Sequence, residues 1–144
     1  MNYAVHDITW KIGKAGRSSV ALDMVPIADV EGLKLSIDGK MVEWNPMDQL
    51  GFARNMMTGK KISMSLTGKR NEGDPGNDYV AGTAFGLGSA CESKIEITLP
   101  DSAGVLTGNV VIDVKTPFGG ETNDVSLLEF DIIFDGKPTF TPGT

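Results

Sequence analysis

Apolar and polar side chains alternate in several short segments, and this period of two constrains the fold more than any other feature. The clearest segment, 128–135, places apolar side chains on one face and acidic ones on the other: Leu128, Phe130, Ile132 and Phe134 against Glu129, Asp131 and Asp135. Successive side chains of a strand point to opposite faces, so the pattern predicts a half-buried strand. Similar segments occur at 8–12, 33–37, 62–66, 94–99 and 106–114.

Glycine and proline separate these segments, as in a mostly antiparallel β domain. Asp38-Gly39 lies between two apolar stretches and predicts a two-residue hairpin turn there. One helix is expected after the run Asp74-Pro-Gly-Asn77, with Asn77 as its N-cap and Gly86 or Gly88 at its end. Tyr79, Val80 and Leu87 are expected to anchor that helix on a sheet. The predicted fold class is an antiparallel β-sandwich or partial barrel with one flanking helix.

The length of 144 residues predicts one domain over 1–144, ending in a loosely held tail at 137–144. A single cysteine, Cys91, excludes an internal disulfide framework, and the N-terminal MNYAVHDITW lacks the pattern of a secretory signal. This favours synthesis in a cytoplasm. The acidic balance, with a net charge of −6, disfavours tight binding of nucleic acid across the surface.

Catalytic and metal-binding constellations are weak in this sequence. His6 is the only histidine, and no serine or cysteine is paired with a base by a known motif. Asn71, Asp74, Asn77 and Asp78 cluster, but their spacing differs from that of a calcium loop and suits a turn entering a helix. We therefore expect no enzymatic activity, no metal and no cofactor.

Charges are segregated along the chain. Residues 49–71 contain five basic residues and no acidic one, whereas 121–135 contain five acidic residues and no basic one. Two unlike, complementary surfaces on identical subunits build rings or filaments rather than closed dimers. This pattern predicts an assembly protein in which the two segments meet across subunits.

Residues 44–60 are rich in apolar side chains but show no strand or helix period, which predicts a long loop. Loops of this length are usually functional or disordered, although a loop that covers the core is the alternative. Methionine, aromatic residues and arginine are enriched at interface cores. The candidate inter-subunit residues are Trp44, Met47, Phe52, Arg54, Met56, Met57, Lys60 and Lys61.

Several segments of the sequence, including 44–60, resemble a known protein family. The run EWNPMDQLGFARNMMTGKKISMSLTGKRNEGDPGNDYVAG, a following strand–turn–strand segment and GGETNDVSLLEFDIIFDGKPT resemble the major tail tube proteins of long-tailed bacteriophages. The similarity extends from about residue 33 to residue 139. Residues 1–30 match less clearly.

The resemblance implies a structural protein that forms hexameric rings, which stack into the tail tube of a virion and conduct DNA into the host. Implied partners are further copies of the chain and the tape measure, terminator and distal tail proteins; DNA passes without specific binding, and the chain does not enter a membrane. Acidic outward strand faces are expected to line the channel or, alternatively, to face the outside. The lumen-facing candidates are Asn109, Asp113, Glu129, Asp131 and Asp135.

Two other readings remain open from the sequence. The inner tube of a contractile tail or a related injection machine shares this implied fold. A monomeric β-sandwich that binds a ligand such as a carbohydrate is the alternative from another class, although only 7% of the residues are aromatic.

Overall fold

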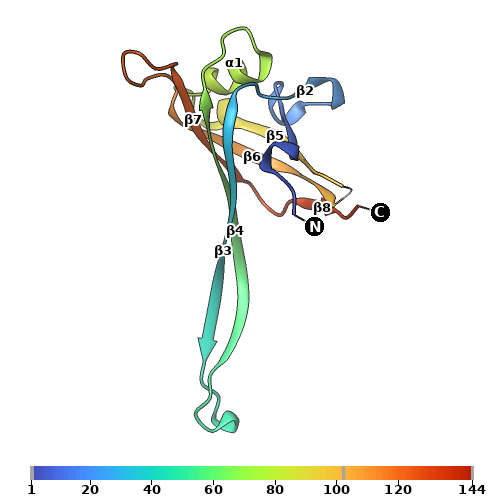
Figure 1. Cartoon of the computed structure of the whole chain (residues 1–144). Coiled ribbons are helices and arrows are strands. Elements are labelled where there is room, and N and C mark those ends of the chain that lie inside the picture. The colour runs from blue at the N-terminus through green and yellow to red at the C-terminus, as the bar shows by residue number, and fades with distance from the viewer. Residues whose placement is uncertain (1, 102, 144) are drawn as a thin grey trace.

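The structure, a computed structural model, describes residues 2–101 and 103–143 and consists of a curled antiparallel sheet with one α-helix (Figure 1). The strand order is β2-β1-β5-β6-β7-β4-β3, and β8 pairs with β6 beside this path. The strands are β1 Thr9–Gly13, β2 Met24–Val25, β3 Val30–Trp44, β4 Arg54–Lys69, β5 Glu92–Leu99, β6 Gly104–Thr116, β7 Leu127–Phe134 and β8 Thr139–Thr141. The helix α1 spans Pro75–Gly82. The predicted fold class, mainly antiparallel β with one flanking helix, is confirmed.

The core lies on one face of the sheet, as the alternating pattern predicts. Along β7 every second residue is buried, and β5 follows the same rule over most of its length. The helix α1 adds Val80 to this core, and the segment before β3 adds Ile27. The fully buried apolar side chains of the strands are Ile12, Met64, Leu66, Ile95, Val110, Ile112, Leu128, Phe130 and Ile132.

The sheet curls strongly enough to bring distant strands together. Three strand-to-strand steps separate β1 from β7, which would be roughly 14 Å in a flat sheet. Yet the rings of Trp10 in β1 and Phe130 in β7 lie 6.4 Å apart. The apolar side is therefore the concave side of a partial barrel.

The central strand β6 has three neighbours. Its first half pairs with β5 from Gly104 to Val111, and its second half pairs with β7 from Val110 to Thr116. The short strand β8 pairs with residues 105–107 on the remaining edge. The segment 137–144, expected to be loosely held, thus contains a strand in the sheet.

Strands β3 and β4 extend well beyond the rest of the sheet as a two-stranded arm (Figure 1). The last pair between β4 and β7 is Ser63 with Ile133, so residues 37–62 leave the body as a hairpin. We call residues 37–62 the arm. Its turn lies at 45–53, where Leu50 and Gly51 adopt left-handed backbone angles with φ of 53° and 92°.

The hairpin turn predicted at Asp38-Gly39 is wrong. Both residues lie inside β3 and pair with Lys61 and Lys60 of β4 without a break. The segments on either side of Asp38-Gly39 share one partner strand, so the chain continues straight rather than reversing. Glycine at position 39 leaves room for the side chain of Met57, because a Cβ there would stand 2.6 Å from the Met57 sulfur.

The loop predicted at 44–60 is shorter in the structure, because β4 begins at Arg54. A β-bulge at Thr58 explains why this strand was missed. Met41 pairs with Met57 while Lys40 pairs with Gly59, so Thr58 is an extra residue that shifts the alternation. Met57 therefore shares a face with Lys60 and Ile62, which lie an odd number of residues away, and the sequence loses its period of two.

The helix begins and ends earlier than predicted. Asp74 is the N-cap, accepting a hydrogen bond from the backbone N–H of Asn77 at 3.0 Å, and Pro75 occupies the first turn. Asn77 is therefore not the cap but a fully buried residue of the first turn. Val80 and the partly buried Tyr79 anchor α1 as expected. Leu87 does not, since it lies beyond the helix and is 89% exposed.

Candidate assembly and channel surfaces

The convex side of the sheet carries mostly polar side chains, and we call it the polar face. The strand register places Asp113 beside Asp131, and Asp131 beside Ser65. In the same way Asn109 lies beside Lys94, and Thr107 beside Glu96. Phe and Trp are absent from the described positions of this face in β4, β5, β6 and β7, which carry polar, acidic, basic and non-aromatic apolar side chains.

The structure brings the lumen-facing candidates together. Asn109, Asp113, Glu129 and Asp131 occupy the polar face of the adjacent strands β6 and β7. Asp135 directly follows β7, and its backbone N–H donates to the carbonyl of Asn109 at 2.8 Å. These candidates thus form one surface, whether or not that surface lines a channel.

The acidic surface is partly compensated by bases. Lys115 lies 2.7 Å from the carboxylate of Asp113. The hydrogen bond to Asp113 and the negative charges of Asp113 and Asp131 raise the pKa of Lys115 above its ordinary value. Lys11 and Lys94 also occupy the polar face, so this face is a mixed surface with an acidic centre on β6 and β7.

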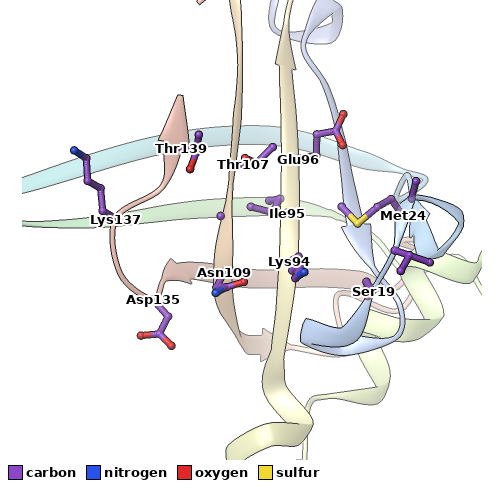
Figure 2. A pocket seen from close by; sticks show the side chains of 13 residues that line it. Ser19, Met24, Lys94, Ile95, Glu96, Thr107, Asn109, Asp135, Lys137 and Thr139 are labelled. Atoms are coloured by element: carbon purple, nitrogen blue, oxygen red, sulfur yellow. The ribbon is translucent and has the colours of Figure 1, made fainter. Parts of the chain in front are cut away.

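A shallow polar groove of about 530 Å³ crosses the polar face over β5 and β6 (Figure 2). Figure 2 shows Lys94, Asn109 and Asp135 around it, with Lys137 on the chain leading to β8. The 16–23 segment and the chain after Asp135 form its other walls. No described side chains in this groove form a nucleophile–base pair or a cluster that fits a metal.

Arg17 joins one wall of this groove to the other. Its guanidinium contacts the carboxylates of Asp135 and Glu92, the latter at 3.5 Å. Asp135 is therefore an ion-paired group that holds the 16–18 turn on the sheet. This distinguishes it from Glu129 and Asp131, which form no ion pair with a described residue.

The polar residues at the start of α1, which the sequence analysis weighed as a calcium loop, form hydrogen bonds and an ion pair within the chain. Asp74 caps the helix, and Asp78 pairs with Arg70 at 2.8 Å. Asn77 accepts from Arg70 and Asn71 and donates to the carbonyls of Ala28 and Lys69. Within 2–101 and 103–143, no three His, Cys, Asp or Glu residues stand in a metal-binding arrangement. The same residues include no helix of the length and hydropathy needed to cross a bilayer.

All the candidate interface residues lie on the arm, and they are exposed. Met47 and Phe52 at its turn are 97% and 76% exposed. Trp44 and Arg54 face each other on neighbouring strands, with the guanidinium 5.5 Å from the indole centroid in a cation–π contact. Met56, Met57, Lys60 and Lys61 are also exposed along β4. Neither of these lysines forms an ion pair with a described residue.

The basic and acidic segments already meet within one chain along part of their length. Residues 63–69 of β4 pair with 127–133 of β7 in the same sheet. These halves are therefore paired within the chain, and a contact of 49–71 with 121–135 across subunits stays a prediction. The remaining halves, the arm with Arg54, Lys60 and Lys61 and the β6–β7 loop with Glu121 and Asp124, are exposed.

Sequence reasoning missed two further apolar surfaces. Leu35 and Ile37 are exposed at the root of the arm, where the false turn at Asp38-Gly39 hid the continuous β3. The β6–β7 loop and the α1–β5 connection expose Phe118, Val125, Phe85 and Leu87 at the other end of the molecule. The alternation of Leu33, Leu35 and Ile37 could have indicated the first surface. No local pattern indicates the second, because each loop contributes a single phenylalanine.

Comparison with solved structures yields full-length matches. One is a chain from the tail of an empty gene transfer agent particle, determined with helical refinement and C6 symmetry. Its TM-score is 0.75 at 18% identity, over 97% of this chain and 99% of that chain. Another is a chain from the virion of a native gene transfer agent particle, with a TM-score of 0.70 at 20% identity over the same shares. No protein-family model and no curated protein matches the sequence.

At these identities the matches establish the fold, which is that of a subunit from a phage-like tail. The tail-tube-like β fold predicted from the sequence is thereby confirmed. The matched chains come from the tail and the virion of gene transfer agent particles.

Proposed function

We propose that this chain is a tail tube subunit, acting as one domain, that forms hexameric rings which stack into a conduit for DNA. The observation that carries the proposal is the match over nearly the whole chain to a tail with C6 symmetry. Its synthesis would take place in the host cytoplasm and its final location would be the virion tail. The expected partners are further copies of the chain, with tape measure, terminator and distal tail proteins at the ends and inside.

The exposed arm supports an assembling role. A lone subunit leaves a row of large apolar side chains in water, from Ile37 through Met47 and Phe52 to Met57. Contiguous exposed apolar surface of this kind marks a protein interaction site. Among the described strands β3 pairs with β4 alone, so the arm also offers an unpaired strand edge to a neighbour. We assign the arm residues to contacts between subunits.

The polar face supports a conduit for DNA. We assign Asn109, Asp113, Glu129 and Asp131 to the channel wall, with Asp135 at its margin. Proteins that hold single strands offer aromatic platforms and basic grooves, and the central strands of this face offer neither. Six chains with a net charge of −6 each carry −36, which opposes adhesion of a polyanion.

Negative-stain electron microscopy of the purified chain at increasing concentration tests the proposal. The expected result is rings, and then tubes, whose end views show six-fold symmetry. Size-exclusion chromatography with light scattering provides the matched solution measurement. A chain that stays monomeric at high concentration, also after addition of tail initiation proteins, would contradict the proposal and favour a free-standing binding module.

A further inference from the structure

An apolar groove opens on the concave side of the sheet where the arm leaves the body. Its volume is about 470 Å³, and it is lined by β3 and β4 on one side and by β5, β6 and β8 on the other. Leu35, Ile37 and Ile62 form its arm side, whereas Ile97, Leu106 and Phe140 form the opposite side. Leu35, Ile37 and Phe140 remain exposed in the lone subunit, so the groove is an apolar surface without a partner.

Two adjacent lysines follow the groove toward the arm tip. Lys60 follows Ile62 on the same face of β4, because side chains two residues apart share a face. Lys61 adjoins it on the opposite face, where Asp38 of β3 is its register partner; residues 54–61 themselves contain no acidic residue. A partner of the groove should therefore present apolar side chains followed closely by carboxylates.

The chain itself carries a segment with this chemistry. The β6–β7 loop, residues 117–126, exposes Phe118 and Val125 at 70% and 62%. Between them lie Glu121 and Asp124, and the loop contains no lysine or arginine. Apolar and acidic groups thus lie side by side in the loop, as apolar and basic groups do along the groove and the arm.

A chain does not fill its own groove with this loop. The β6–β7 loop and α1 lie at the end of the body from which the arm points away, whereas the groove lies at the arm root (Figure 1). The two surfaces are unlike and lie apart, the loop at the far end of the body and the groove at the arm root. A contact between them is heterologous, and repeated along one direction it builds an open stack rather than a closed dimer.

We propose that the apolar groove at the arm root receives the β6–β7 loop of a second copy, with Phe118 as the anchor and with Glu121 and Asp124 beside Lys60 and Lys61. The contact joins successive rings of the tube, so this inference rests on the proposed function. Aromatic anchors in desolvated pockets dominate interface energies, and the complementary charges fix the register.

Site-directed cross-linking tests the contact. In a Cys91→Ser background, a chain with Ile37→Cys and Phe118→Cys is assembled and treated with a short bismaleimide. Because every chain carries both partners, denaturing electrophoresis should show a ladder of dimers, trimers and longer species. A matched chain with Ile37→Cys and Leu22→Cys, where Leu22 is an exposed residue of another surface, should give no ladder. Tubes without a ladder, or equal ladders in both chains, would overturn the inference and leave the tube function standing.

Charge reversal gives a second test that does not depend on cysteine variants. Lys60→Glu with Lys61→Glu should raise the concentration needed for tubes by about tenfold or more, while single rings persist. Glu121→Lys with Asp124→Lys should do the same, and mixing the two variants should restore mixed tubes. Failure of the mixture to assemble better than either variant alone would overturn the pairing. Loss of rings as well as tubes in the unmodified chain would instead contradict the proposed function.

Discussion

Single residues show how the functional surfaces are held on the body. Asn77 was expected to cap a helix, but its buried amide connects α1 to the end of β4 and to the segment before β3 through four hydrogen bonds. Arg17 plays a similar role on the other side, because it ties the 16–18 turn to β5 and to the end of β7. Both residues fix loops on the sheet from which the arm projects.

Replacement of Asn77 by alanine should destabilise the subunit by at least about 2 kcal/mol, because it leaves the carbonyls of Ala28 and Lys69 and the N–H of Asn71 without their partner. Urea unfolding of the unassembled subunit measures this change. Loss of the true cap in Asp74→Ala should cost about 0.5–2 kcal/mol. The exposed Asn55→Ala serves as the neutral control. A cost for Asn77→Ala near that of Asn55→Ala would mean that the amide network contributes nothing.

At the scale of elements, the sequence predicts strands and buried faces that depend on a local pattern. It fails where pairing with a strand distant in the sequence determines the structure. The alternation in β5 and β7 predicts both strands and their buried faces, since each is a half-buried strand with an undisturbed period. Asp38-Gly39 carries a local turn signal, but the unbroken pairing of β3 with β4 overrides it. The bulge at Thr58 hides the start of β4 for the same reason.

The candidate surfaces, too, include some that a local pattern predicts and some that it does not. Alternation predicts that Asp113 and Asp131 point away from the core, and the strand register then places them side by side. The exposure of Met47, Phe52 and Met56 follows from an arm that no local pattern reveals. The groove at the arm root joins strands distant in sequence, so only the curled sheet shows it.

The arm should be the least protected part of the sheet in a free subunit. Amides of residues 54–61 pair with β3 alone, whereas residues 63–69 of the same strand lie between β3 and β7. We expect hydrogen exchange at 54–61 to be much faster than at 63–69 in the subunit and to slow on assembly, because regions with few buried contacts open locally. Mass-spectrometric exchange on subunit and tube measures both segments in one experiment. Equally strong protection of 54–61 in both states would place the arm in the subunit's own core.

At the scale of the whole molecule, two sides of one sheet carry two roles. The concave side builds the core and, at its open end, the groove, while the convex side presents the acidic centre of β6 and β7. The arm and the loops beyond α1 lie at opposite ends of the body (Figure 1). Under the proposed function, this polarity would give the stack of rings a direction, as a conduit that starts at one protein and ends at another requires.

Reversal of two charges tests the channel wall. Glu129→Lys with Asp131→Lys should leave tubes intact but slow DNA delivery, because the new bases bind phosphate. Delivery of a marker by particles that contain the variant measures the effect. Glu129→Gln with Asp131→Asn removes the same carboxylates without adding bases and should deliver nearly normally. Normal delivery through tubes with both lysines would place these residues on the outside of the tube.

The methionines of the arm have a consequence for chemical durability. Met41, Met47, Met56 and Met57 are exposed in the lone subunit, and oxidation to the sulfoxide turns such a flexible apolar side chain into a polar one. In the proposed tube, where neighbours cover the arm, peroxide would have far less access to these sulfur atoms. Brief oxidation should therefore disable subunits that still await assembly and spare finished tubes. Under the proposed function, a cell under oxidative stress would lose the capacity to build tails before it lost the tails already built.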